Sequence, residues 1–209
     1  MLRLYCCDIR DTEPSEAALP LSDYRRERLR AVRAPQLRQE MLAAERLLIR
    51  AVLDWTPAIA LPLEIGVGEK GKPYFAALPL SFSLSHSGLY VACALADFPI
   101  GVDIQRRTHT REALLRRCFS EEEHEYILSQ KDPDGAFTAL WSLKESYVKA
   151  LGTGLTLPLS SFSIRLENTL SLKGDNSVNF WTRSEGEYQL SICALNGNSP
   201  IPDIITAGM

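Results

Sequence analysis

The sequence predicts an α+β fold, because each half of the chain carries strand-like and helical segments in the same order. Each half begins with a strand-like segment, continues through helical segments and ends in further strand-like segments. With 209 residues, 45% of them hydrophobic, the chain can bury a substantial core. No sequence repeat relates the halves, but their common pattern indicates an N-terminal lobe, residues 1–100, and a C-terminal lobe, residues 101–209.

The N-terminal lobe is expected to open with a strand and a pair of helices. Alternating apolar residues over 2–9 predict the strand. Ser22 or Asp23 can cap a first, basic helical segment, and Pro35 interrupts it. Apolar residues then recur at helical spacing up to Trp55, which predicts a second helix with one buried face.

Frequent proline and glycine between residues 57 and 79 favour a loop with short strands. The stretch GVGEKGKP matches part of a phosphate-binding P-loop, but Pro73 stands where a magnesium-binding Ser or Thr is needed. We therefore interpret Lys72 as a single phosphate contact or as an ordinary turn lysine. Residues 81–105 then predict strands around a Ser-His-Ser-Gly turn at 85–88.

The C-terminal lobe is expected to hold two helices followed by antiparallel strands. Ser120 and Glu123 form a capping-box signature for the first helix, and the DPDG stretch at 132–135 predicts the turn that ends it. The second helix is expected to run from about Phe137 to Gly152. The alternating segments SFSIRLE and YQLSICAL predict the strands.

Composition and charge exclude several classes of protein. The net charge of −3 and the pI near 5.7 argue against a dedicated nucleic-acid binder. No apolar run has the length of a membrane span or of a signal peptide core. The five cysteines include no C-x-x-C motif and indicate reduced packing residues without disulfides. We therefore expect a cytoplasmic protein that binds neither nucleic acid nor a membrane.

Positive charge is concentrated in the predicted helices of the N-terminal lobe. Between Arg25 and Arg50 there are eight arginines and three glutamates. Such a stretch can bind phosphates, and the alternative is a solvated helix face with partial ion pairing.

Asp103 lies in the segment GVDIQ, which otherwise has the character of an interior strand. An unpaired carboxylate taken out of water is costly, so Asp103 needs a cation, several donors or solvent. In the helical segment WSLKESYVKALGTGL, Glu145 and Lys149 lie on one face, as a surface ion pair or as part of a functional site. Asp103 and Glu145 together suit Mg²⁺, which takes one or two protein carboxylates and completes its shell with water and substrate phosphates.

Ser85 and His86 lie beside a glycine turn in the segment SLSHSG. A Ser-His nucleophile is one interpretation, but no third catalytic group is evident downstream. Anion recognition by the two side chains is a better functional interpretation, and a structural turn histidine is the alternative.

These motifs resemble the signature of a known family. GKP, SHSG, GVDI, FSEEE, WSLKESYVKALGTGL and LPLSSFSIRL, in that order, are similar to motifs of the 4′-phosphopantetheinyl transferases, in particular of the long type that activates surfactin synthetase and similar systems. The resemblance runs over most of the chain. It implies a monomer with two similar lobes related by pseudo-twofold symmetry, each a small antiparallel sheet packed with a long helix. Coenzyme A would bind in the cleft between them.

The resemblance also implies roles for individual residues. Asp103 and Glu145 would bind magnesium, and Lys149 would neutralise the pyrophosphate of coenzyme A. The residues that would hold the phosphates of the coenzyme are Lys72, Ser85 and His86, with Arg25 and Arg28 at the 3′-phosphate. Long members often carry Glu two positions after the aspartate, where this chain has Gln105, whose carbonyl oxygen can bind Mg²⁺ but brings no charge.

The implied reaction is the Mg²⁺-dependent transfer of the 4′-phosphopantetheine arm from coenzyme A to a serine of an apo carrier protein (acyl, peptidyl or aryl), with release of 3′,5′-ADP. Asp103, Glu145 and Lys149 would be the catalytic residues, with Glu145 as the general base, directly or through a metal-bound water. Two alternatives stay open: a coenzyme A-binding or carrier-binding protein without activity, and a magnesium-dependent phosphohydrolase.

Carrier proteins are acidic, so a basic, partly apolar helix is expected to dock them. The segment 106–118 has this character, through Arg111, Arg116, Arg117, Leu114 and Leu115. Packing of the two leucines on their own lobe is the alternative interpretation.

Overall fold

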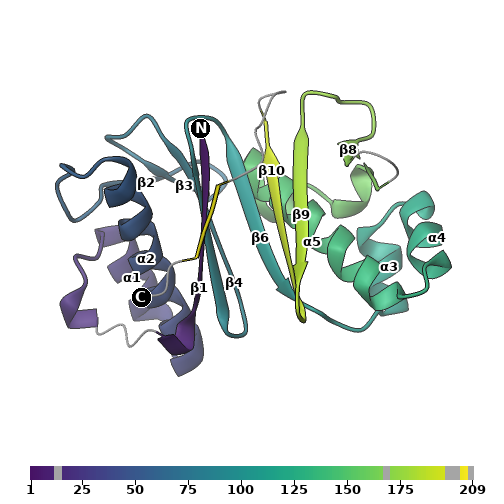
Figure 1. Ribbon diagram of the computed structural model, residues 1–209, viewed down its shortest axis with the longest axis horizontal. Helices are drawn as coiled ribbons and strands as arrows, with labels where there is room; N and C mark the ends of the chain where they lie inside the picture. Colours follow the sequence, from purple (N-terminus) through teal and green to yellow (C-terminus); the bar gives the residue numbers. More distant parts are fainter. Residues whose placement is uncertain (12–15, 167–169, 196–202, 207–209) are drawn as a thin grey trace.

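In the computed structural model, two small sheets stack face to face, and a long helix covers the outer face of each sheet (Figure 1). The structure describes residues 1–11, 16–166, 170–195 and 203–206. The prediction of an α+β fold is confirmed, because the sheets are largely antiparallel and the helices are segregated to their outer sides.

The N-terminal lobe contains a sheet with the strand order β11-β1-β5-β4. Its strands are β1 (Leu2–Asp8), β4 (Ser81–Ser87), β5 (Tyr90–Ala96) and β11 (Asp203–Thr206). Strands β1, β5 and β4 are antiparallel neighbours, whereas β11 comes from the end of the chain and pairs with β1 in parallel. The remaining elements of this lobe are α1 (Asp23–Ala31), α2 (Pro35–Trp55), the hairpin β2 (Ile65–Val67) and β3 (Pro73–Phe75), and two short 3₁₀ turns at Ile9–Asp11 and Glu16–Ala18.

The C-terminal lobe contains a sheet with the strand order β6-β10-β9. Its strands are β6 (Ile100–Arg106), β9 (Asn179–Glu185) and β10 (Tyr188–Ala194). Its helices are α3 (Glu112–Cys118), α4 (Glu121–Ser129) and α5 (Pro133–Leu151), with 3₁₀ turns at Gly154–Thr156 and Leu159–Ser161. The short strands β7 (Ile164–Arg165) and β8 (Ser171–Leu172) form a separate pair.

The two lobes share one topology. In each, a first strand leads to a long helix and then to a hairpin whose second strand pairs with the first strand. The N-terminal series is β1, α2, β4 and β5, and the C-terminal series is β6, α5, β9 and β10. The sheet orders β1-β5-β4 and β6-β10-β9 therefore correspond strand for strand, as expected of lobes related by pseudo-twofold symmetry. We propose a lobe boundary between β5 and β6, near residue 100.

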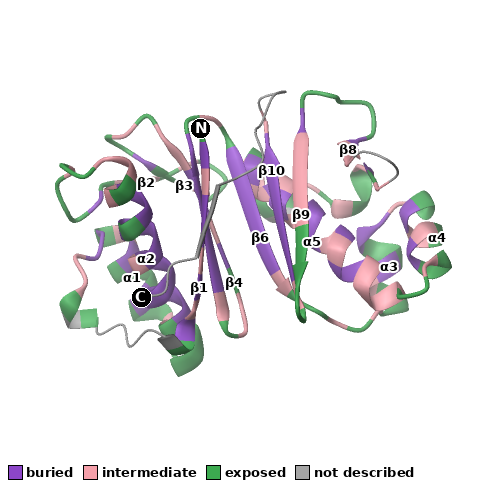
Figure 2. Ribbon diagram, viewed as in Figure 1, coloured by how far each residue is buried: buried purple, intermediate pink, exposed green. Residues whose placement is uncertain are grey.

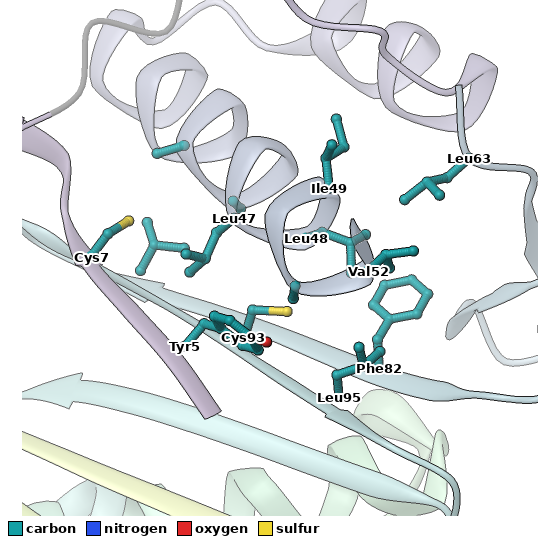
Figure 3. Close-up of a cluster of buried hydrophobic side chains, with 14 of the residues drawn as sticks. Tyr5, Cys7, Leu47, Leu48, Ile49, Val52, Leu63, Phe82, Cys93 and Leu95 are labelled. Atoms are coloured by element: carbon teal, nitrogen blue, oxygen red, sulfur yellow. The ribbon is translucent and has the colours of Figure 1, made fainter. Parts of the chain in front are cut away.

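The apolar core forms three layers across this sandwich. Equivalent strands of the two lobes, β1 with β5 and β6 with β10, contribute the small and branched side chains packed between the sheets. On the outer face of the N-terminal sheet, α2 packs Leu47, Leu48 and Val52 against Tyr5 and Cys93 (Figure 3). On the other side, α5 packs on β6 and β10, so these two strands are buried along most of their length (Figure 2).

A row of serines joins the two lobes where β4 lies beside β6. The hydroxyl oxygens of Ser83, Ser85 and Ser87 accept hydrogen bonds from the backbone N–H groups of Val102, Ile104 and Arg106, at 3.0, 3.1 and 2.9 Å. Both series advance by two residues, so β4 and β6 run in the same direction with one serine for every second residue. The serine row satisfies an edge of β6 that would otherwise leave buried donors unpaired.

Gly101 allows β6 to approach α5 closely. A Cβ atom at this position would overlap the carbonyl oxygen of Ser146 and the backbone nitrogen of Ala150. We expect Gly101→Ala to lower the free energy of unfolding by at least about 1–3 kcal/mol, because strand and helix must move apart. Chemical denaturation measures this change, and Gly68→Ala is the matched control, since its Cβ would meet nothing nearer than 3.4 Å. Equal midpoints for the two variants would contradict the prediction.

Local signals placed most elements correctly. The first strand and the two helices of the N-terminal lobe are confirmed, and the side chain of Ser22 caps α1 by accepting from the N–H of Arg25. The capping box of Ser120 and Glu123 is confirmed at the start of α4. The proline-rich and glycine-rich segment before β4 is a loop that holds the short strands β2 and β3, as predicted.

Three expectations about element boundaries were wrong. The DPDG stretch begins a helix instead of forming a separate turn: Asp132 is the N-cap of α5, its side chain accepts from the N–H of Gly135, and α5 starts at Pro133. Ser85 and His86 lie in strand β4, and the turn comes after them. The predicted strand SFSIRLE has only two paired residues, in β7, and its last residue, Glu167, lies outside the described residues.

Strand β9 and the returning strand β11 were not predicted. β9 is half-buried to exposed along its length and carries no clear apolar alternation, so its pairing with β10 defines it. The five cysteines, all within the described ranges, form no disulfide bonds. Across the described ranges, no helix is both long enough and apolar enough to span a lipid bilayer.

Candidate active site

A cavity of about 430 Å³ lies at the junction of the two lobes. Its walls come from α1, α2, the β2–β3 hairpin and β4 on the N-terminal side, and from α5 and the glycines after it on the C-terminal side. The basic residues that line it are Arg25, Arg28, Lys70, Lys72, His86 and Lys149. Glu145 is the one acidic residue among the described lining residues. This lobe-junction cavity therefore favours a ligand that carries several negative charges.

The carboxylate of Asp103 has a cationic partner and a hydroxyl partner in the structure. Asp103 is 5% exposed, and its Oδ1 accepts hydrogen bonds from Lys149 Nζ at 2.7 Å and from Ser85 Oγ at 2.9 Å. Ser85 Oγ also accepts from Lys149 Nζ and from the N–H of Ile104, so its single proton and both lone pairs are used. Strand β4 of one lobe thereby holds a carboxylate of the other lobe in a fixed position.

Glu145 lies one helical turn before Lys149 on α5 and faces the same cluster. Burial raises the pKa of Glu145, and the nearby charge of Asp103 raises it further, whereas Lys149 opposes both effects. A carboxyl group with a raised pKa is a stronger base than an ordinary glutamate, which suits proton transfer near neutral pH.

Asp103 and Glu145 stay a predicted pair of ligands for a hard cation. The second carboxylate oxygen of Asp103, Oδ2, is buried and has no hydrogen-bond partner among the described residues, as a ligand position for a cation requires. The described part of the chain contains no group of three or more His, Cys, Asp or Glu side chains that could hold a metal ion. Two carboxylates with open positions suit Mg²⁺, which keeps several waters, and do not suit a closed site for zinc.

Gln105 lies two residues after Asp103 on β6 and is half-buried. Its Nε2 donates to the backbone oxygen of Arg106 at 3.0 Å. The side chain is not part of the cavity lining described above. A role for Gln105 at the metal stays a prediction.

Lys72 lines the cavity but also connects the two lobes. Its Nζ donates to the backbone oxygens of Ala150 at 2.8 Å and Ile100 at 3.1 Å, at the end of α5 and the start of β6. Burial lowers the pKa of Lys72 to about 8. One N–H remains for the phosphate contact that we predict for this residue.

Arg25 and Arg28 both reach the cavity from α1, but in different environments. Arg25 is 7% exposed, and its Nε donates to Glu45 Oε2 at 2.9 Å. Arg28 is exposed, and its Nη1 donates to the hydroxyl oxygen of Tyr24 at 2.7 Å. Arg28 is thus the freer cation, whereas Arg25 is held in place by a buried carboxylate.

Several residues at this site were not predicted from the sequence. Glu40 on α2 lies 2.7 Å from Nδ1 of His86, and no motif connects the two positions. Lys70 lines the cavity from the turn of the β2–β3 hairpin. Ser83 and Ser87 had no assigned role, although the alternation of serine along SFSLSHS is the signal that could have revealed the serine row.

Comparison with known proteins gives a consistent family. Residues 99–193 match the model of the 4′-phosphopantetheinyl transferase superfamily. The chain is 39% identical over 142 residues to a 4′-phosphopantetheinyl transferase of Bacillus subtilis, over 63% of this chain and 63% of that protein. It is 34% identical over 146 residues to the 4′-phosphopantetheinyl transferase AcpT of Salmonella typhimurium, over 66% of this chain and 72% of that protein.

Among solved structures, the holo-[acyl-carrier-protein] synthase of Thermotoga maritima matches with a TM-score of 0.42 and 22% identity, over 48% of this chain and 64% of that one. The chain spans 63% of the length of the Bacillus subtilis relative. The family match covers β6 to β10, the elements that carry Asp103, Glu145 and Lys149. This chain therefore belongs to the 4′-phosphopantetheinyl transferase superfamily, and within it to the long type.

Proposed function

We propose that this protein transfers the 4′-phosphopantetheine arm of coenzyme A to a serine of an apo carrier protein and releases 3′,5′-ADP. The observation that carries the proposal is the cluster of Asp103, Glu145 and Lys149. Glu145 and Lys149 line a basic cavity that both lobes build, and Asp103 lies behind them, bonded to Lys149. Coenzyme A is a polyanion with a diphosphate and a separate 3′-phosphate, so it matches a cavity with several cations. Because one chain supplies both walls, we propose that the protein acts as a monomer. We also propose that it acts in the cytoplasm.

In this proposal the protein supplies no nucleophile. Glu145 accepts the proton of the serine hydroxyl, whose oxygen attacks the β-phosphorus while the bond to 3′,5′-ADP breaks. Lys149 neutralises charge that grows on the diphosphate oxygens, and it reaches them from its position beside Asp103. The phosphates of coenzyme A are held by five further side chains, some through direct contact and others by supporting the contacting groups: Lys72, Ser85, His86, Arg25 and Arg28.

Asp103 and Glu145 would hold Mg²⁺, since both offer carboxylate oxygens and Asp103 Oδ2 has no partner among the described residues. When bound, the ion stabilises negative charge on phosphate oxygens as a Lewis acid. In the structure Lys149 neutralises Asp103 at 2.7 Å, and from this position its ammonium group would also face the diphosphate.

Gln105→Glu is expected to tighten magnesium binding about tenfold, because it adds a negative charge two residues after Asp103. Magnesium titration by calorimetry, with coenzyme A present, measures the effect. Gln130→Glu, at the end of α4, is the matched control for the added charge alone. Superimposable titrations of the wild type and Gln105→Glu would show that this side chain lies outside the coordination sphere.

Docking of an acidic carrier is proposed to use the exposed arginines of the α3 region. Leu115 is 1% exposed and belongs to the core of its own lobe, so it does not contribute to docking. Arg111 and Arg117 are exposed, whereas Arg116 is paired with Glu112 at 2.8 Å. We expect the KM for the carrier to rise with ionic strength, and Arg111→Ala with Arg117→Ala to reduce that salt dependence. An unchanged salt dependence would remove α3 as the docking site.

One assay tests the proposed function against its alternatives. The protein is incubated with coenzyme A, Mg²⁺ and a panel of apo carrier proteins, and mass spectrometry detects addition of the phosphopantetheine arm. A phosphohydrolase would cleave coenzyme A without a carrier, and a binding protein would leave both substrates intact. Either result, obtained across the panel, would overturn the proposal.

A further inference from the structure

We propose that Glu40 is a positioning residue of the lobe-junction cavity, which holds the imidazole of His86 so that Nε2 is presented to the 3′-phosphate of coenzyme A. This inference rests on the proposed function. It assigns a role to a residue of α2 that lies outside every motif of the sequence.

The contact between Glu40 and His86 is built into the core-facing side of α2. Glu40 is 7% exposed, and its Oε2 lies 2.7 Å from Nδ1 of His86. Its other oxygen, Oε1, accepts a hydrogen bond from Nε2 of Gln36 at 3.1 Å. Both carboxylate oxygens are therefore engaged, and neither can rotate toward the cavity without breaking a bond.

This contact determines which ring nitrogen of His86 carries the proton. A carboxylate only accepts hydrogen bonds, so Nδ1 must be the protonated nitrogen in the neutral ring. Nε2 is then left for the cavity, which His86 lines. Burial lowers the pKa of His86, and Lys149 and Arg25 lower it further, whereas Glu40 raises it. A phosphate that brings negative charge to Nε2 adds to the effect of Glu40, and so favours the protonated ring as a donor.

The position of His86 on β4 indicates which phosphate it meets. Side chains alternate along a strand, and the serine row faces β6 and the cluster around Asp103. His86 projects to the opposite side, toward α2, where it contacts Glu40, and the cations that act on it are Lys149 and Arg25. Because the diphosphate is assigned to the side of Lys149, the anion nearest His86 is the separate 3′-phosphate.

The test compares the affinity for coenzyme A with that for 3′-dephospho-coenzyme A, by calorimetry. Glu40→Met removes the acceptor at similar volume, and Glu40→Gln keeps an oxygen but removes the charge. We expect Glu40→Met to bind coenzyme A about tenfold more weakly and Glu40→Gln to lie between it and the wild type. Neither variant should change the affinity for 3′-dephospho-coenzyme A. The matched control is Asp54→Asn, another carboxylate of α2, which pairs with Arg50 away from the cavity.

A spectroscopic readout separates positioning from a general loss of structure. The chain has three histidines, so the ring nitrogens of His86 can be assigned by long-range ¹H–¹⁵N correlation spectra. We expect the Nδ1–H tautomer for neutral His86 in the wild type and its loss in Glu40→Met. A mainly Nε2–H tautomer in the wild type would overturn the inference.

The outcomes distinguish this inference from the proposed function. If the wild type binds both coenzymes equally, the 3′-phosphate is not recognised and the inference is overturned, although the proposed function stands. If the wild type binds neither coenzyme, the proposed function and the inference both fail. If the wild type prefers coenzyme A and Glu40→Met keeps the full preference, Glu40 does not position His86, although the proposed function stands. Equal losses for both coenzymes would indicate a structural role only, and would also overturn the inference.

Discussion

Glu145→Ala is expected to lower the rate of phosphopantetheine transfer by about 10³-fold or more. A general base contributes roughly 10²–10⁴-fold to a proton-transfer step. The same substitution also removes one of the two carboxylates that we propose as metal ligands, so the loss of the base and the loss of a ligand would occur together. The rate is measured by mass spectrometry of the carrier protein at saturating coenzyme A.

Two variants make this prediction sharper. Glu145→Gln keeps a side-chain oxygen for the metal but cannot take a proton, so it should still bind magnesium while its rate falls as in Glu145→Ala. Glu125→Ala, an exposed glutamate of α4, is the matched control and should retain full activity. Near-normal turnover of Glu145→Ala would exclude Glu145 both as ligand and as base.

The pKa of Glu145 adds a pH dependence to the same experiment. Burial, with the charge of Asp103, raises this pKa. Glu145 therefore loses its proton, and can act as a base, only in a pH range above the one in which an ordinary glutamate titrates. The transfer rate of the wild type should therefore rise with pH through that range, as the proton leaves Glu145. A rate that is flat there, with an unaltered rate-limiting step, would contradict the assignment.

Lys144→Met is expected to cause the largest loss of stability, about 3–5 kcal/mol in the free energy of unfolding. Lys144 is 0% exposed, and its Nζ lies 2.7 Å from Glu123 Oε2. It also donates to the backbone oxygens of Leu159 and Phe162, and so connects α5 and α4 with the chain that follows α5. Removing the lysine leaves a buried carboxylate without its cation. Urea denaturation measures the loss.

The other hydrogen bonds of Glu123 explain which second substitution should restore stability to Lys144→Met. Oε1 and Oε2 of Glu123 also accept from the N–H groups of Ile164 and Ser120, so an oxygen is needed at this position even without charge. Glu123→Gln added to Lys144→Met should restore part of the loss, because an amide keeps an acceptor and removes the unpaired charge. Lys173→Met is the matched control, since Lys173 and Glu122 form a solvent-exposed pair and little change is expected. Equal losses in Lys144→Met and Lys173→Met would contradict the prediction.

Elements specified by local signals were predicted well. Ser22 and the capping box at Ser120 mark helix starts through bonds to backbone groups three residues away, so the sequence alone contains the signal. The DPDG stretch shows the limit of such signals. Asp followed by Pro favours a turn and also favours a helix start, and the chain uses Asp132 as the N-cap of α5. β9 has no local signal of its own, since its partner β10 defines it.

The candidate site likewise combines contacts that the sequence predicts with contacts that it does not predict. Glu145 and Lys149 share a helix, so their common face follows from the helical repeat. Asp103 was recognised as a carboxylate that needs a partner, but the partner in the structure is Lys149 together with Ser85. That contact joins β4, β6 and α5, which no spacing within one segment can specify.

The sequence by itself determined most of the strands and helices, the two-lobe pattern and the residue types that can do the chemistry. These depend on interactions between residues a few positions apart, which a pattern records directly. Only the tertiary structure decided that the serine row joins the lobes, that Lys72 connects them through Ile100 and Ala150, and that Glu40 faces His86. Each of these contacts joins elements that are distant in the chain, and the packing of two sheets and two helices brings them within bonding distance.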